Sequence, residues 1–547
     1  MEKRFLLAVI LSFMTLYAWQ VVSPKPVKAP IAINKTETIT AQQDKDTSLL
    51  SDNQKTVTSN ENASLSTSGA VLNKTVVIIE GEKLDLSISN IGGVLDSVFI
   101  KEYDETLPLT NIGSVFGFEN VEFVLKEQTA RAISYTFEDE NYLINKTYTL
   151  SKEDYSVKMD ISIQGKSKMS NLSEMAIGAY TIDMSSLDNN TGKFGGDAEK
   201  NRDKSLNEYV VYSTKEMLRK NNAYKFSPKD RVVTQDSVNW VGFRNRYYCA
   251  IFKPLFDTKG FSLNPVDKER LKVEIEPLSV KAEKEQHVAY SFVCYFGPEK
   301  LNILKKFDLS FEKIRRYYRF GLFDTIAKFI LSIMNLIYSI VPNWGVCILL
   351  ISIIIYFSMY PLTKRSMVSM KRMQAMQPKV NALKEKYKNN PQKMNEEMMK
   401  VYKENKINPL GGCLPMLLQT PVFIGLYQVL WRSVSLKGAS FLWIKDLSAP
   451  DRLFLLPKSF PIIGNEINIL PLIMMIVMYF QQKLSTQNMA SADPAQIAQQ
   501  KMMSKIFPLF LGFIFYKFAS GLTLYFTMFY FFSTFTQWKM SKEPKVV

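Results

Sequence analysis

The sequence predicts an α-helical polytopic membrane protein with six spans and a cytoplasmic helical hairpin, joined to a large all-β sandwich domain outside the membrane. Apolar blocks of spanning length lie at the start and in the second half of the 547-residue chain. Residues 76–300 instead alternate apolar and polar side chains with a period of two, as half-buried strands do. The lysines and arginines behind the net charge of +16 concentrate beside the apolar blocks, which favours a membrane over nucleic acid as the reason for the charge.

The N-terminal block is predicted to be a signal-anchor transmembrane helix over residues 1–22. Met1 to Arg4 is basic, and Phe5 to Val22 is a mostly apolar run of 18 residues with no small-residue cleavage site before Ser23. A cleaved signal peptide is the alternative, but the apolar run is longer than its usual hydrophobic region. Residues 23–75 contain no aromatic side chain and are rich in polar ones, which predicts a disordered extracytoplasmic tether.

The β-domain is predicted over residues 76–300. Val157, Met159, Ile161 and Ile163 alternate with polar residues, which is typical of antiparallel strands with one buried face. Cys249 and Cys294 both fall in this domain, so a disulfide is conceivable, but their apolar strands favour two free buried thiols. No cysteine spacing suits a metal and His287 is the single histidine, so we expect no metal site and no histidine triad.

Residues 301–342 are predicted to be a linker and an interfacial amphipathic helix. Between Arg315 and Val341 one polar stripe recurs at helical spacing, which favours a helix lying in the membrane interface over one that spans it. After Pro342, the uncharged stretch Trp344 to Tyr360 is predicted to span and to end at Pro361. Lys364 and Arg365 place that end in the cytoplasm.

Residues 364–406 are predicted to form a cytoplasmic antiparallel helical hairpin. This segment holds twelve lysines or arginines, too many for a span. Its apolar residues step by three and four, which indicates a coiled-coil seam bent near Pro378. The hairpin also holds seven methionines, and the candidate contact residues are Met370, Met373, Met376 and Met398. Methionine side chains adapt to many apolar surfaces, so these residues either meet a client or simply fill the seam.

Three further apolar blocks complete the predicted core, which covers residues 343–538. They are Pro409 to Trp431, Phe460 to Phe480 and Ile506 to Phe535. The basic tail, residues 539–547, is expected in the cytoplasm, so the last block must cross twice. Ala519 to Gly521 offers the turn, and the last two spans are expected to be short.

Most polar side chains within the predicted spans are hydroxyls and amides. Apart from Glu466, near the start of the block from Phe460, no predicted span holds an aspartate or glutamate, which argues against an ion-driven carrier, and no catalytic constellation or phosphate loop is visible. We therefore expect neither an enzyme nor a cofactor. The neutral groups, which either line a wet groove or join helices by hydrogen bonds, are Ser352, Tyr356, Gln419, Thr523, Thr527 and Thr534.

A series of short motifs resembles the YidC/Oxa/Alb insertase family. They are Met359-Tyr-Pro-Leu-Thr-Lys364, Met376-Gln-Pro-Lys379, Asn408-Pro-Leu-Gly-Gly-Cys413-Leu-Pro415, Gln419 to Phe423, Trp443-Ile-Lys-Asp-Leu-Ser448 and Ser520-Gly-Leu-Thr-Leu-Tyr-Phe526. Ser89-Asn-Ile-Gly-Gly93, Trp240-Val-Gly-Phe and Tyr295-Phe-Gly-Pro298 are similar to the Gram-negative type of the family.

The resemblance implies an insertase and chaperone that inserts and helps to fold transmembrane segments in the bacterial inner membrane, without a cofactor or metal. It implies a periplasmic β-domain and a hydrophilic groove open to cytoplasm and lipid. The implied partners are nascent membrane proteins, the ribosome, the lipid bilayer and the Sec translocon (SecYEG, SecDF), with no nucleic-acid readout. The groove residues it suggests are Ser352, Tyr356, Gln419, Phe423, Phe526 and Thr527.

One position departs from the family pattern. The family usually carries a basic groove residue five positions before the proline of the Tyr-Pro-Leu-Thr motif, and this chain has Tyr356 there. The cation in the last apolar block is Lys517, which lies close to the predicted outer turn. A lysine there is expected to snorkel to the interface, with a groove charge as the alternative.

Overall fold

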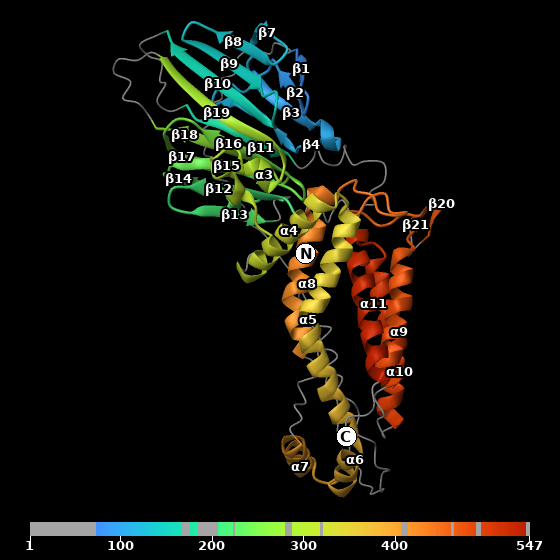
Figure 1. The fold of residues 1–547 in the computed structure, drawn as a ribbon. Coiled ribbons are helices and arrows are strands. Elements are labelled where there is room, and N and C mark those ends of the chain that lie inside the picture. The colour runs from blue at the N-terminus through green and yellow to red at the C-terminus, as the bar shows by residue number, and fades with distance from the viewer. Residues whose placement is uncertain are drawn as a thin grey trace, which may run out of the picture.

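The computed structural model describes residues 73–166, 175–183, 206–221, 225–278, 287–317, 321–405, 414–460, 464–487 and 494–542. The predicted anchor, all but the last three residues of the predicted tether, and the tail beyond Lys542 lie outside these ranges. Figure 1 shows the β-domain at one end of a helical region and a small helical hairpin at the other.

The largest sheet has nine strands, all paired antiparallel, in the order β13-β12-β15-β16-β19-β10-β9-β8-β7. In chain order its strands are β7 (Val124–Gln128), β8 (Ala132–Glu138), β9 (Tyr142–Leu150), β10 (Ser156–Gly165), β12 (Glu208–Ser213), β13 (Met217–Asn221), β15 (Val238–Arg244), β16 (Tyr248–Pro254) and β19 (His287–Pro298). The predicted alternation is confirmed in β10, where Val157, Met159, Ile161 and Ile163 are all buried.

A second sheet of six strands shares one hydrophobic core with the first. Its main path is β14-β17-β18-β11-β5, and β6 also pairs with β11. The strands are β5 (Leu109–Thr110), β6 (Ser114–Val115), β11 (Ile177–Asp183), β14 (Val232–Thr234), β17 (Thr258–Pro265) and β18 (Arg270–Pro277). Tyr180 of β11 contacts Phe252 of β16 with ring centroids 4.7 Å apart, so the two sheets pack face to face. A four-stranded sheet adjoins them, formed by β1 (Val76–Glu80), β2 (Leu84–Ser89), β3 (Val94–Ile100) and β4 (Glu105–Thr106).

The β-domain core contains one fully buried lysine. The Lys146 ammonium donates to the carbonyls of Gly92 (2.6 Å) and Gly113 (2.8 Å) and lies 4.8 Å from the Phe123 ring centroid. Burial lowers the pKa of Lys146 to about 7, because removing an ammonium from water disfavours its charge. Gly92 adopts φ 72°, a left-handed conformation that glycine allows at little cost.

Cys249 and Cys294 are free and buried, as the sequence favours. They lie on neighbouring strands but face Gly297 and Phe252, respectively, in the β16–β19 register. Burial raises the pKa of the Cys249 thiol, so this group is unreactive.

A short linker joins the β-domain to the helices. It contains α3 (Leu301–Lys305) and the 3₁₀ turn η4 (Phe311–Ile314), whose Leu304, Phe311 and Ile314 are buried in the β-domain core. The next helix, α4 (Gly321–Ile340), starts later than the predicted Arg315 because Arg315 pairs with Glu299 and the Arg316 carbonyl accepts from Arg244 of the β-domain. Figure 1 shows α4 running obliquely to the other helices beside the β-domain.

The first helix of the core is longer than the sequence predicts. Helix α5 (Trp344–Ala375) continues through Pro361 for several turns, so the expectation that it ends there is wrong. Proline removes one backbone donor, and a long helix tolerates that loss. α5 breaks at Met376, just before Pro378, and α6 (Gln377–Lys386) and α7 (Pro391–Glu404) then contact each other as a helical hairpin that is shorter than the predicted 364–406.

The remaining helices also differ from the predicted blocks. Helix α8 (Leu414–Arg432) is followed by the 3₁₀ turn η6 (Val434–Leu436) and by a hairpin of β20 (Phe454–Phe460) and β21 (Gly464–Ile467). The block from Phe460 therefore begins as a strand, and α9 (Leu470–Gln487) starts ten residues later, where Asp451 accepts the amides of Ile469 and Leu470. Helices α10 (Pro494–Phe515) and α11 (Ser520–Lys542) are separated near the predicted turn; both helices extend into polar sequence, and the apolar stretch of α10 is the short Ser504–Phe515.

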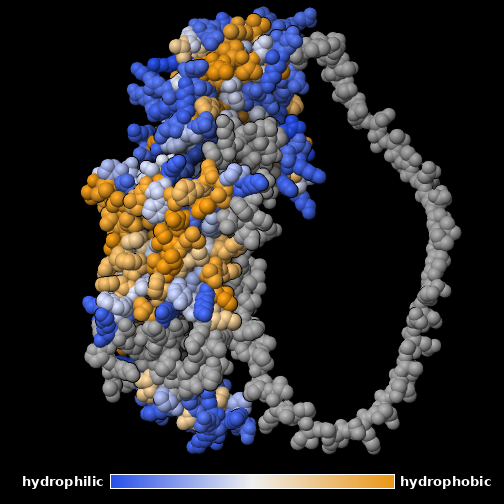
Figure 2. All heavy atoms as spheres, turned by 90° about the vertical axis from the view of Figure 1, so that its right-hand side faces the viewer, coloured by the Kyte–Doolittle hydropathy of each residue, from blue (hydrophilic) through white to orange (hydrophobic). Residues whose placement is uncertain are grey.

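A hydrophobic belt covers the helical region on the face of the molecule that Figure 2 shows. Figure 2 shows hydrophobic side chains gathered on it, between a largely hydrophilic β-domain and a hydrophilic hairpin. Among the described residues, two helical stretches are long and apolar enough to span a membrane, Gly321–Ile340 and Trp344–Ser369. Leu470–Leu484 and Ser504–Phe515 are apolar but shorter. The fold thus combines a β-rich domain with a helical membrane region.

Candidate functional site

Helix α11 lies at the centre of the helical core. It contacts α9, α5 and α8, while α10 packs on α9 and α4 packs on α8 and α5. Buried residues of these helices form a second hydrophobic core, separate from that of the β-domain. The six groove residues predicted from the sequence all lie on α5, α8 and α11.

Three of the predicted groove residues meet between α8 and α11. The rings of Phe423 and Phe526 are 5.1 Å apart in an edge-to-face arrangement. Gln419 donates from Nε2 to the hydroxyl of Tyr525 at 3.2 Å. Gln419, Phe423 and Phe526 are partly exposed whereas Tyr525 is buried, so the first three form a mixed polar and aromatic surface along this helix pair.

The other three predicted groove residues lie inside the bundle. Ser352 is fully buried and donates within its own helix to the Ile348 carbonyl at 2.5 Å. Thr527 is buried and donates to the Thr523 carbonyl at 2.8 Å. Tyr356 is 4% exposed, and its hydroxyl donates to Oγ1 of Thr536 on α11 at 2.5 Å. The Tyr356 hydroxyl therefore forms a hydrogen bond between α5 and α11.

The predicted hairpin contact residues do not all lie on the hairpin itself. Met370 and Met373 belong to the extension of α5, and the Met370 side chain lies outside the described part of the structure. Met376 marks the break before α6, and Met398 is on α7. Met373, Met376 and Met398 are half-buried, which suits both the contact and the seam interpretation.

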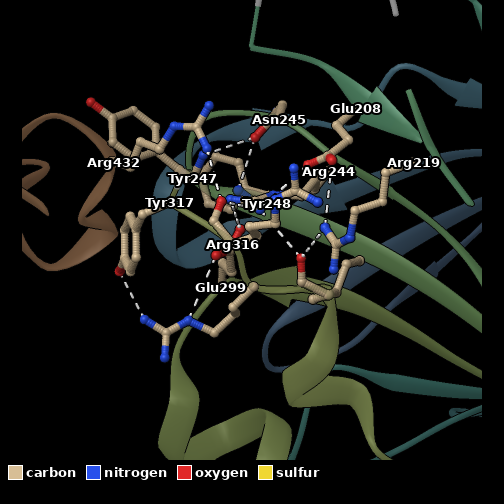
Figure 3. Close-up of polar contacts among 12 residues, drawn as sticks. Glu208, Arg219, Arg244, Asn245, Tyr247, Tyr248, Glu299, Arg316, Tyr317 and Arg432 are labelled. Atoms are coloured by element: carbon tan, nitrogen blue, oxygen red, sulfur yellow. Dashed lines mark hydrogen bonds and ion pairs between the residues drawn. The ribbon is translucent and has the colours of Figure 1, made fainter. Parts of the chain in front are cut away.

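A buried charge cluster, which the sequence reasoning missed, joins the β-domain to the linker. We call it the arginine junction and define it as Glu208, Arg219, Arg244, Glu299 and Arg315. Figure 3 shows Arg219 and Arg244 pointing toward Glu208, with Glu299 nearby. Every member has a side chain less than one tenth exposed.

Arg244 occupies the middle of the arginine junction. Its guanidinium lies 2.7 Å from the Glu299 carboxylate and donates to the Arg316 carbonyl at 2.9 Å. Burial acts to lower the pKa of Arg244, but Glu299 and Glu208 outweigh it and raise the pKa above its usual value. Since breaking a buried pair leaves an uncompensated charge, this cluster fixes where the linker leaves the β-domain.

Two further cations attach the β-domain to the helical core. Arg246, in the β15–β16 turn, donates to the carbonyls of Trp431 (2.9 Å) and Ser448 (3.1 Å). Lys437, just after η6, contacts the Glu105 carboxylate at 3.0 Å and donates to the Tyr248 hydroxyl at 2.9 Å. The two parts of the chain are therefore held by specific polar contacts as well as by the linker.

The sequence around these charged residues indicates that they are buried. Arg244 directly follows the apolar Trp240 to Phe243, Arg246 comes two residues later, and Glu299 directly follows Pro298 at the end of a buried strand. Charges at such positions indicate a buried partner, because an unpaired buried charge is costly. The partner's identity depends on long-range pairing and is not encoded locally.

The helical core contains few side chains that could catalyse a covalent reaction. No aspartate or glutamate occurs in α5, α8, α9, α10 or α11. No cluster of three metal-ligating side chains occurs within the described ranges. The arrangement suits binding through hydrogen bonds and apolar contact.

Comparisons with known proteins agree along almost the whole chain. A family model described as the 60Kd inner membrane protein matches residues 336–546, and one described as the YidC periplasmic domain matches residues 106–333. The chain is 32% identical to the membrane protein insertase YidC of Syntrophobacter fumaroxidans over 410 residues, 74% of this chain and 69% of that protein. It is 30% identical to that of Geotalea uraniireducens over 552 residues, 96% of each chain. A solved structure of an active YidC insertase, with its first transmembrane domain resolved, matches 87% of this chain and 94% of that one at 17% identity, with a TM-score of 0.37.

Proposed function

Because this chain belongs to the YidC family of membrane protein insertases, we propose that the surface between α8 and α11 receives the polar tail of a client while the client's apolar helix passes into lipid. The family is non-enzymatic and integral to the inner membrane, with a periplasmic domain, and its substrates are nascent membrane proteins.

The proposed topology has six spans with both termini and the hairpin in the cytoplasm. The hydrophobic belt between the β-domain and the hairpin supports it, as do the cations at the hairpin end of α5. Helix α4 is proposed to lie in the outer interface, because its exposed side chains include both Phe329 and Leu336 and it runs obliquely to the bundle. Residues 343–538 then form the insertase core.

The observation that carries the proposed groove is the partly exposed Gln419 beside Phe423 and Phe526. An amide on this surface gives a polar tail a hydrogen-bonding partner at membrane depth, where an unpaired polar group costs several kcal/mol. Burial of the client's apolar helix in lipid supplies the driving force, at roughly 25 cal/mol per Å². No nucleotide is required by this mechanism.

The hairpin is proposed as the first contact for a client or a ribosome. Its cations favour a polyanionic surface, and its half-buried methionines adapt to different apolar helices. Cooperation with the Sec translocon (SecYEG and SecDF) is proposed on family resemblance alone.

The test is insertion of a short single-span client into liposomes containing the purified protein, scored by protease protection. Gln419→Leu should lower insertion of a client with a polar tail by about 2- to 10-fold, the equivalent of one neutral hydrogen bond. Asn335→Leu is the matched control, because Asn335 is an exposed amide on α4. Protection no greater than in protein-free liposomes would refute the function, and equal losses in both variants would refute the groove.

A further inference from the structure

A small hollow opens where the β-domain meets the outer end of the helical core. Its lining comes from four separate parts of the chain: the β15–β16 turn, the end of α8, the loop after η6, and the α10–α11 turn with the start of α11. The lining residues are Arg246, Tyr427, Trp431, Ser448, Pro450, Lys517, Phe518, Ala519 and Leu522. We call it the junction pocket; it is a narrow hollow that opens to the surface.

Both charged side chains of the junction pocket are cations. Arg246 is 7% exposed, and its guanidinium lies over the rings of Tyr247 (4.6 Å) and Trp431 (5.7 Å). Lys517 is exposed at the α10–α11 turn. No lining residue is acidic. An anion bound at this hollow would meet two cationic side chains and no acidic side chain of the lining.

The arginine is held in place before any ligand arrives. Its Nε donates to the Trp431 carbonyl and its Nη2 to the Ser448 carbonyl, so two elements of the core fix the guanidinium plane. Arginine recognises phosphate with directed hydrogen bonds, whereas lysine acts as a mobile point charge. The first two amides of α11 are bonded to the carbonyls of Ala449 and Leu447, so the recognising groups are the two side chains.

The rest of the pocket lining is apolar or aromatic. Phe518, Leu522 and Pro450 provide an apolar wall beside the cations. Tyr427 and Trp431 are the residue types that favour the boundary between hydrocarbon and headgroups. A free inorganic ion makes no favourable contact with these apolar side chains. An amphiphile, in contrast, places its phosphate on the cations and its glycerol and upper acyl carbons against the apolar side chains.

We propose that the junction pocket binds the headgroup phosphate of an anionic phospholipid from the outer leaflet of the membrane. This rests on the proposed topology, which places the α10–α11 turn at the outer interface. The bound lipid would bridge the β-domain turn and the core, and it gives Lys517 a role beyond that of a snorkelling anchor.

The experiment is native mass spectrometry of the full-length protein in detergent, titrated with phosphatidylglycerol. Lys517→Glu is compared with Lys458→Glu, because Lys458 is exposed on β20, outside the pocket lining. We expect Lys517→Glu to weaken phosphatidylglycerol binding about tenfold, the loss of one charged contact. Lys458→Glu should bind like the unmodified protein. Arg246→Lys, which keeps the charge but not the two fixed hydrogen bonds, should weaken binding by a smaller factor.

Two further arms separate lipid from free phosphate. Diacylglycerol with the same acyl chains should bind poorly, and millimolar inorganic phosphate should not displace phosphatidylglycerol. Equal binding to Lys517→Glu and the unmodified protein would overturn the proposal, and so would full displacement by inorganic phosphate. No client is present in this assay, so its failure leaves the insertase proposal standing, and a failed insertion assay leaves this result intact.

Discussion

Tyr356 stands where the family usually has a groove cation, and the structure gives its hydroxyl a partner inside the protein. The hydroxyl donates to Thr536 at 2.5 Å, and both side chains are less than one tenth exposed. Tyr356→Phe should therefore act on the α5–α11 contact. Hydrogen bonds between membrane helices contribute about 0.6 kcal/mol on average and up to ~1.7, so the melting temperature should fall only slightly.

The assay is liposome insertion of two clients that differ only in an acidic or a neutral tail. Tyr356→Phe should change both by the same factor, at most about fivefold, because the hydroxyl is already occupied. Thr536→Val is the matched partner variant, and the double variant should be no worse than either single one. Selective loss of the acidic client in Tyr356→Phe, without such a loss in Thr536→Val, would refute the reasoning.

Tyr356→Arg places a cation at the position where the family usually carries one, and it tests whether this position can meet a client's tail. At 1.5 Å per residue, Tyr356 lies ~18 Å along α5 from Trp344, deep in the proposed span. An arginine at such depth costs about 2.5–3.5 kcal/mol. Hydrogen bonds to charged groups contribute ~1.5–3 kcal/mol against ~0.5–1.5 for neutral ones, so Tyr356→Arg should raise acidic over neutral insertion about five- to tenfold. An unchanged ratio would show that this position does not meet the tail.

Three further predictions concern stability, topology and the two appended parts. The pKa of Lys146 is lowered to about 7 in the folded β-domain, so between pH 7 and ~10 the unfolded chain binds the extra proton and stability rises with pH. Urea unfolding of residues 73–317 should show a gain of about 2–3 kcal/mol from pH 6 to 9, which Lys146→Met should abolish; an unchanged slope would contradict the assignment. Single-cysteine labelling in intact cells should find Lys542→Cys protected and Lys445→Cys accessible, and the reverse would remove the six-span topology. Deleting most of the β-domain should impair insertion less than deleting residues 364–406 at matched protein levels, and equal losses would contradict a leading role for the hairpin.

Local patterns predicted most of the elements correctly. The alternation in β10 is buried on one face, the hairpin breaks just before Pro378, and α10 and α11 separate near Ala519. The predicted end of α5 at Pro361 was wrong. A single proline removes one hydrogen bond, and the remaining hydrogen bonds of a long helix outweigh that loss. The prediction that a spanning helix begins at Phe460 was wrong, because hydropathy does not distinguish an apolar strand from an apolar helix.

The sequence by itself determined the family, the division into a β-rich part and a helical part, and the largely neutral polarity of the spans. These follow from composition, periodicity and short motifs, which are properties of neighbouring residues. Only the tertiary structure decided which groups meet: Tyr356 with Thr536, Gln419 with Tyr525, and Arg244 with Glu299. The partners are separated by 180, 106 and 55 residues along the chain, and no local pattern specifies such a pairing. The packing of whole helices and sheets brings them together, because burying each polar group requires a partner that the chain can supply only once it is folded.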